Sequence, residues 1–231
     1  MKNLSKILTL ATGVFLLFVS TASAVTCASD TLGAYLGLPS TGCKVGGVIF
    51  SGFTPRNDLL QTGATPLAPA AITVNPVNGS LNPGLEFVVN LAVGPDEPGT
   101  LLQAVFGFTV SGAAFDGATL TMDGASATGD AAVTVVKEIG GFSPLIIFAT
   151  ALDADILEQL TLPSAGPLDV IMDITADGGF DGNGTSTLRS ATAQFLISQA
   201  QPGVIPEPST LALVALGFAG FALTRSRRPK P

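Results

Sequence analysis

The feature that most constrains the fold is the recurrence of apolar residues at every second position in the middle of the chain. Over Leu85–Val93, apolar side chains occupy every second position and polar residues such as Glu86 fall between them. An alternation with period two places one face of a β-strand in a core and the other in water. The pattern recurs at Gln103–Val110, Leu168–Thr175 and Ala191–Ile197. Five shorter runs are further candidate strands: Val45–Phe50, Ala71–Val74, Ala118–Met122, Ala131–Val136 and Leu145–Ala149.

Turn-forming residues separate these candidate strands. The chain has 27 glycines and 16 prolines, and clusters such as Asn82-Pro83-Gly84 lie between the apolar runs. About nine short strands, each with one buried face, predict an all-β fold: a single β-sandwich over residues 25–198 with Greek-key or jelly-roll-like connections. One segment differs. Asp153–Leu160 begins with acidic residues and places apolar side chains at helical spacing, so we expect a short helical turn there.

Residues 1–24 have the layout of a secretory signal peptide. Lys2 and Lys6 form a basic start, an uncharged and mostly apolar run follows at 7–19, and small residues at Ala22 and Ala24 precede a cleavage site. The pattern predicts Val25 as the first residue of the exported protein. The apolar run is short for a membrane span.

The C-terminal segment has three parts in a fixed order. After a polar linker at 199–205 come Pro206, Glu207 and Pro208, where the two prolines keep the backbone extended. Residues 208–224 carry no charge and reach the lower limit for crossing ~30 Å of hydrocarbon. A basic cluster ends the chain: Arg225, Arg227, Arg228 and Lys230. The pattern over 206–231 therefore predicts a C-terminal transmembrane helix that holds an exported body on the outer face of the inner membrane.

This ending resembles the PEP-CTERM sorting signal of exported bacterial proteins. The resemblance rests on the Pro-Glu-Pro triad, the Ser-Thr-Leu after it, the short glycine-containing span and the arginine-rich end. It implies that an exosortase-type membrane processing enzyme recognises Pro206, Glu207 and Pro208. It also implies removal of the tail and delivery to the cell surface or the extracellular matrix. The region from Cys27 to Phe53 resembles the start of several exported PEP-CTERM proteins of unassigned role.

Charge is distributed unevenly along the chain. Six of the ten basic residues lie in the two terminal segments, so the middle keeps four against 16 carboxylates, a formal charge of −12. A body this acidic repels nucleic acid, and we expect no nucleic-acid partner. The chain has two cysteines, Cys27 and Cys43. Export favours a disulfide between them, with free thiols or metal ligation as the alternatives.

The composition removes the common catalytic arrangements. The chain has no histidine, so histidine-based triads are excluded and a tetrahedral zinc site lacks ligands. The one local metal candidate is a glycine-rich loop in which Asp177, Asp181 and Asn183 carry oxygen atoms, the ligands that calcium prefers. An acidic turn without a metal explains the same residues. No other cofactor is expected.

Together these observations predict a non-enzymatic protein that is exported, sorted by an exosortase-type system and left at the cell surface or among extracellular polysaccharide. Two alternatives stay open. A carbohydrate- or protein-binding adhesion module suits a β-sandwich, although the chain has no tryptophan and Tyr35 is its single tyrosine. A carboxylate-dependent glycoside hydrolase needs two acids on either side of a sugar, and 16 carboxylates provide many pairs.

Overall fold

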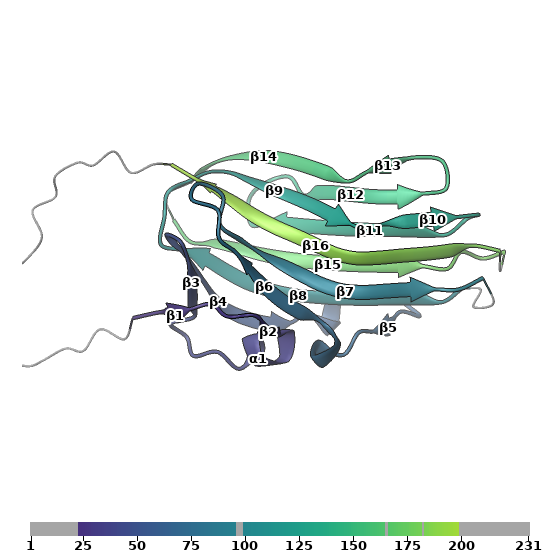
Figure 1. The fold of residues 1–231 in the computed structure, drawn as a ribbon, viewed down its shortest axis with the longest axis horizontal. Helices are drawn as coiled ribbons and strands as arrows, with labels where there is room; N and C mark the ends of the chain where they lie inside the picture. Colours follow the sequence, from purple (N-terminus) through teal and green to yellow (C-terminus); the bar gives the residue numbers. More distant parts are fainter. Residues whose placement is uncertain (1–22, 96–98, 165, 182, 199–231) are drawn as a thin grey trace, which may run out of the picture.

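The computed structural model describes residues 23–95, 99–164, 166–181 and 183–198. In this part of the chain the strands form two facing sheets, one with nine strands and one with seven (Figure 1). Apolar side chains from both sheets fill the space between them. The predicted all-β sandwich is confirmed.

Sheet A is the nine-stranded sheet. Its strand β5 (Thr65–Pro66) pairs in parallel with β8, and the other eight strands lie side by side. In spatial order these are β1 (Val25–Thr26), β3 (Cys43–Val45), β4 (Val48–Pro55), β8 (Leu101–Ser111), β15 (Leu168–Asp177), β11 (Ala132–Ile139), β12 (Leu145–Thr150) and β13 (Ala154–Asp155).

Sheet B is the seven-stranded sheet. Its strand β10 (Ser126–Thr128) pairs with β16, and the other six strands lie side by side. In spatial order these are β14 (Leu157–Ser164), β9 (Phe115–Asp123), β16 (Thr185–Ile197), β7 (Gly84–Val93), β6 (Thr73–Val77) and β2 (Asp30–Thr31).

Several of the long strands that follow each other in the chain lie in opposite sheets. Strands β7, β8 and β9 lie in sheets B, A and B, and β14, β15 and β16 repeat that sequence. The central neighbours β8, β15 and β11 in sheet A, and β9, β16 and β7 in sheet B, are therefore far apart in sequence. This is Greek-key connectivity across a double sheet. It brings residues from distant segments together on the outer faces of the sheets.

The core is built around phenylalanine rings at inward-facing strand positions. Their rings pack closely, with centroids 4.8 Å apart for Phe87 and Phe106 and 5.8 Å apart for Phe115 and Phe195. All four side chains are buried. Full burial of each contributes about 1.5–3 kcal/mol. Phe87 lies in sheet B and Phe106 in sheet A, so their contact helps to hold the two sheets together, whereas Phe115 and Phe195 pack within sheet B.

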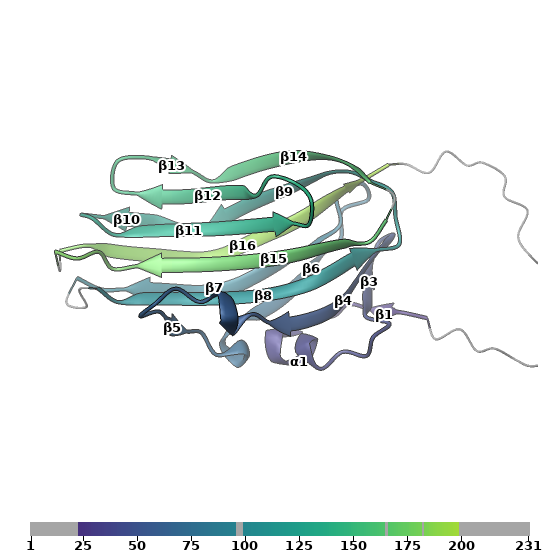
Figure 2. The same ribbon diagram turned by 180° about the vertical axis from the view of Figure 1, so that it is seen from behind.

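A disulfide between Cys27 and Cys43 ties β1 to β3, which confirms the predicted pair. The loop that it closes contains the helix α1 (Leu32–Leu36), which the alternation did not predict. Thr31 caps this helix because its Oγ1 accepts a hydrogen bond from the N–H of Ala34 at 3.2 Å. Figure 2 shows α1 beside β4 at one edge of the sandwich.

The helical turn expected at Asp153–Leu160 is wrong. Residues Ala154–Asp155 form β13, and Leu157–Ser164 form β14, which pairs with β9 along Leu157–Thr161. Strand β9 needs a partner for its free backbone groups, and that pairing overrides a short helical spacing of apolar residues. Two apolar residues of the expected helix are left in solvent, since Ile156 is 53% exposed and Leu157 58%, whereas Leu160 is half-buried against the core.

Two other expected strands have different limits. Val45–Phe50 is a hairpin between β3 and β4, with Gly46 at the turn in the left-handed region (φ +57°). Ala71–Val74 begins at the end of the short helix η2 (Pro69–Ala71) and continues into β6. A second short helix, η1 (Asn57–Leu59), follows β4.

Candidate functional site

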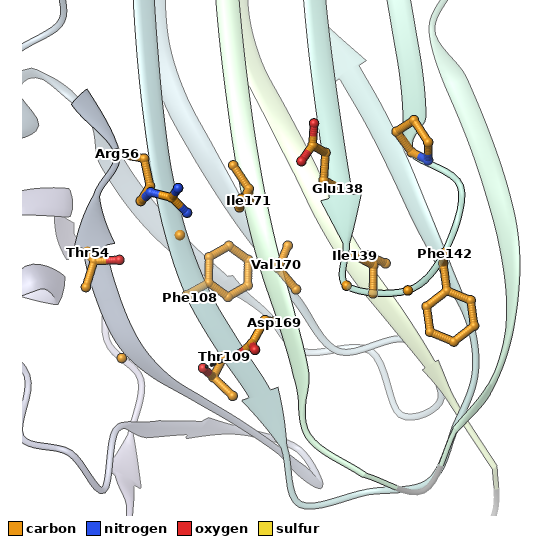
Figure 3. Close-up of a pocket in the computed structure, with 15 residues that line it drawn as sticks. Thr54, Arg56, Phe108, Thr109, Glu138, Ile139, Phe142, Asp169, Val170 and Ile171 are labelled. Carbon is orange, nitrogen blue, oxygen red and sulfur yellow. Dashed lines mark hydrogen bonds between the residues drawn. The ribbon is translucent and has the colours of Figure 1, made fainter. Parts of the chain in front are cut away.

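A groove of about 470 Å³ lies on the outer face of sheet A (Figure 3). Strands β4, β8, β15 and β11 and the turn after β11 contribute to it. Its floor is made by residues that face away from the core, because β8 turns Phe106 and Phe108 inward and Gly107 and Thr109 outward. β4, β8, β15 and β11 are neighbours in sheet A because the chain passes to sheet B and back between them.

Gly107 keeps the middle of the groove open. A Cβ atom at this position would lie 3.4 Å from both Thr54 Oγ1 and the carbonyl oxygen of Val170, and 3.8 Å from Arg56 Cγ. These are ordinary van der Waals distances, so a Cβ would fit beside the adjacent wall but would take up part of the space that glycine leaves open. Glycine in the interior of a strand weakens the strand, and here it leaves a space on the sheet surface.

A β-bulge in β4 shapes the wall next to β8. The pairing of β4 with β8 shifts register between Ser51 and Thr54, and Gly52 within it has a φ of +64°. Beyond the bulge, β4 carries Thr54, and Arg56 follows the strand. In Figure 3 the Arg56 side chain extends over β8 toward β15.

Arg56 is fixed by a carboxylate outside the groove. Its Nε and Nη2 donate to Asp58 Oδ1 and Oδ2, each at 3.0 Å. This bidentate hydrogen bond raises the pKa of Arg56, with a smaller contribution from the charge of Glu138 across the groove, and lowers the pKa of Asp58. Asp58 thus holds the guanidinium in place and balances its positive charge.

The opposite wall is the end of β11 and the turn after it. Glu138 is exposed at the end of the strand, and Gly140 donates its N–H to the carbonyl oxygen of Asp169 at 2.9 Å. Phe142 is half-buried and packs against the core. On the floor, Thr109 Oγ1 donates to Asp169 Oδ1 at 3.0 Å. The groove therefore offers carboxylate acceptors on one side, a guanidinium on the other, and an aromatic ring at the rim.

A second polar cluster on the same face has a structural role. Gln103 is fully buried, and its Nε2 donates to both oxygens of Asp173 at 2.9 Å. Its Oε1 accepts from the N–H of Gln61 at 2.7 Å, and Thr175 also donates to Asp173. These hydrogen bonds hold the segment around η1 and β5 against sheet A.

The predicted calcium ligands lie around a turn in which carboxylate oxygens already accept hydrogen bonds from backbone N–H groups. Asp177 Oδ1 accepts from the N–H of Gly179 at 2.9 Å, and Asp181 and Asn183 are exposed. Asp130 accepts the N–H groups of Phe180 and Asp181, and these hydrogen bonds lower its pKa. Among the described residues, no group of three or more His, Cys, Asp or Glu side chains is arranged to hold a metal. Calcium binding stays a prediction.

Sequence reasoning did not single out Arg56, Glu138 or Asp169. They lie in three elements whose neighbourhood depends on the strand order, and nothing in their local sequence distinguishes them from surface charges. Lys137 was also missed, although an available signal existed: the alternation of β11 continues past the expected end at Val136 and places Lys137 on the inward face with Val135.

The terminal predictions fall at or beyond the edge of the described residues. Ala24 precedes β1, whereas Ala22 and the predicted sorting residues Pro206, Glu207 and Pro208 lie outside them. The predicted C-terminal span lies outside them too. Within the residues that the structure describes, no helix is both long and apolar enough to cross a membrane.

The described part of the chain thus belongs to the class of disulfide-containing two-sheet β-sandwich domains. Residues 204–228 match the PEP-CTERM protein-sorting motif. This confirms the resemblance of the C-terminus and indicates an exported protein that is a substrate of exosortase, a membrane processing enzyme. No curated protein and no solved structure matches the chain.

Proposed function

We propose that the chain is a non-enzymatic protein of the cell surface or the extracellular matrix. In this proposal a signal peptidase removes residues 1–24, the C-terminal segment holds the body at the inner membrane for a time, and an exosortase cuts near Pro206-Glu207-Pro208. The observation that carries the proposal is the sorting motif at residues 204–228. The β-sandwich with its disulfide is consistent with an oxidising compartment outside the cytoplasm.

Intact mass and location of the protein test this proposal. In cells with the exosortase we expect a surface or extracellular species that starts at Val25 and has lost the basic tail. In cells without the enzyme, the tail is retained and the protein stays with the inner membrane. Replacement of the motif by E207A with P208A gives the same retained mass in normal cells, because the recognition element is gone. A tail that stays on in every strain would overturn the sorting part of the proposal.

A binding module is the second candidate function, and the groove on sheet A favours it. Pockets that bind small molecules and sugars combine apolar walls with a few fixed polar groups, and this groove has both. Binding and surface location are compatible, since a matrix protein holds other components of the matrix.

A glycoside hydrolase is the third candidate. Glu138 and Asp169 are the two carboxylates of the groove, and such an enzyme would use one as an acid and the other as a base or nucleophile. Release of reducing ends from polysaccharide, abolished by E138Q and by D169N, would replace the non-enzymatic proposal by this one. We expect no release above the background measured with either variant.

A further inference from the structure

The groove on sheet A has the hydrogen-bonding character that suits hydroxyl groups. Arg56 and Thr54 lie on one wall, and Glu138 lies on the other. A guanidinium only donates hydrogen bonds and a carboxylate only accepts them, whereas a hydroxyl does both. A ligand that carries several hydroxyls on a rigid frame can bond to both walls at once.

Charge in the groove selects against acidic ligands. The positive charge of Arg56 is already paired with Asp58 at 3.0 Å, and the groove lining adds two carboxylates, Glu138 and Asp169, and no further cation. The body around them has four basic residues against 16 carboxylates. Polymers that carry uronate, sulfate or phosphate groups are therefore repelled.

The rim supplies an apolar surface for a sugar ring. Phe142 is half-buried, and its contact with the core holds the ring while part of it stays accessible. Pro144 is exposed beside it in the same turn. A pyranose presents C–H groups on its faces, and these pack on aromatic and proline rings. The two types of contact, apolar at the rim and polar across the floor, match the two sides of a sugar.

We propose that the groove formed by β4, β8, β15 and β11 binds an uncharged saccharide. Arg56, Glu138 and Asp169 hydrogen-bond its hydroxyls and Phe142 packs against a ring. Gly107 leaves the floor free for the chain of sugars to lie across β8. This inference rests on the proposed function, which places the protein at the cell surface or in the extracellular matrix, but it makes a separate claim about one surface.

Affinity electrophoresis of the purified, processed protein tests the inference. The native gels contain one polysaccharide each: dextran, a mixed-linkage β-glucan or galactomannan as uncharged polymers, and alginate or polygalacturonate as anionic ones. We expect slower migration in at least one uncharged polymer and unchanged migration in both polyuronates. Retardation by no uncharged polymer, or by the polyuronates alone, overturns the inference.

Variants then locate the binding surface. E138Q and F142A are expected to weaken binding about tenfold each, as loss of a charged hydrogen bond or an aromatic contact does. F180A is the matched control, because Phe180 is also an accessible phenylalanine, 85% exposed, but lies on a turn outside the groove. Thermal melting confirms that each variant is folded. Equal binding by F142A and the unchanged protein, or loss of binding in F180A alone, overturns the assignment to this groove.

Failure of this inference and failure of the proposed function show in different measurements. The sorting proposal depends on the mass and location of the protein in cells, and the groove proposal depends on migration of purified protein. A protein that is trimmed and exported but migrates alike in every gel retains its proposed function and loses the saccharide site.

Discussion

At the scale of single residues, Lys137 is the most unusual side chain in the core. It is fully buried at an inward position of β11, and its Nζ donates to the carbonyl oxygens of Thr119 at 3.2 Å and Gln194 at 3.0 Å on the opposite sheet. The same nitrogen lies 3.9 Å from the centre of the Phe195 ring. Burial lowers the pKa of Lys137 well below the ordinary value for lysine.

This lysine predicts a pH-dependent stability. The unfolded chain keeps the lysine proton up to a pH of about 10.4, whereas the folded chain releases it at a lower pH. Between those two values the unfolded state binds more protons, so the free energy of unfolding rises with pH. Urea unfolding between pH 6 and pH 9.5 should show this rise. K137M should lack it and be more stable at pH 7, because no ammonium has to be desolvated in the core.

Tyr35 predicts the opposite trend at higher pH. Its hydroxyl donates to the carbonyl oxygen of Ala28 at 2.8 Å, and burial, with help from the charge of Asp30, raises its pKa to about 12. Above pH 10 the unfolded tyrosine ionises first, so the folded state binds more protons and stability falls as pH rises toward 12. The fall should be absent in Y35F, measured by the same urea titration. A fall of equal size in Y35F would assign it to another group.

At the scale of elements, β14 shows where tertiary pairing outweighs local pattern. It is the edge strand of sheet B, and it pairs with β9 on one side. Pro163 lies in this strand, and proline at a sheet edge limits pairing with a further strand.

Amide exchange distinguishes the observed strand from the helix that the spacing of Ile156, Leu157 and Leu160 suggested. In an edge strand every second N–H points to the neighbouring strand and the others point to solvent. We therefore expect slow exchange at alternate residues from Leu157 to Thr161, measured by NMR. Slow exchange at consecutive residues would be the helical pattern and would contradict the pairing with β9.

The disulfide acts at the same scale because it closes the segment that contains α1. Cys27 and Cys43 are 16 residues apart. A closed loop of about that length stabilises a protein by about 3 kcal/mol, mainly through the unfolded chain. The double variant C27S/C43S should lower the free energy of unfolding by about that amount in urea. Reduced protein without substitutions is the matched control, and it should have the same stability as the variant.

The sequence predicts the sheets better than it predicts the sites. Alternation along β7 and β16 identifies their buried faces because a sandwich strand has one dry and one wet side. The short helix α1 and the strand β14 depend on contacts with distant segments, so their local sequences are ambiguous. The groove residues Arg56 and Glu138 meet through the strand order, which alternation does not encode.

At the scale of the whole molecule, the distribution of negative charge over the surface bears on function. The body carries its negative charge on outward strand positions and turns, while the core between the sheets is almost entirely apolar. A surface of this kind stays soluble and separates similar molecules from each other. It is consistent with the release into a matrix that we propose for this protein.

The two ends of the described chain leave the sandwich at the same end of the molecule (Figures 1 and 2). Val25 begins β1, and Ser198 directly follows β16, where its N–H bonds to the carbonyl oxygen of Ala114. Proteolysis before Val25 and in the sorting segment therefore breaks no bond between strands. In the proposed maturation, the hydrogen bonds between the described strands are the same before and after the two cuts, so the sandwich imposes no order on them.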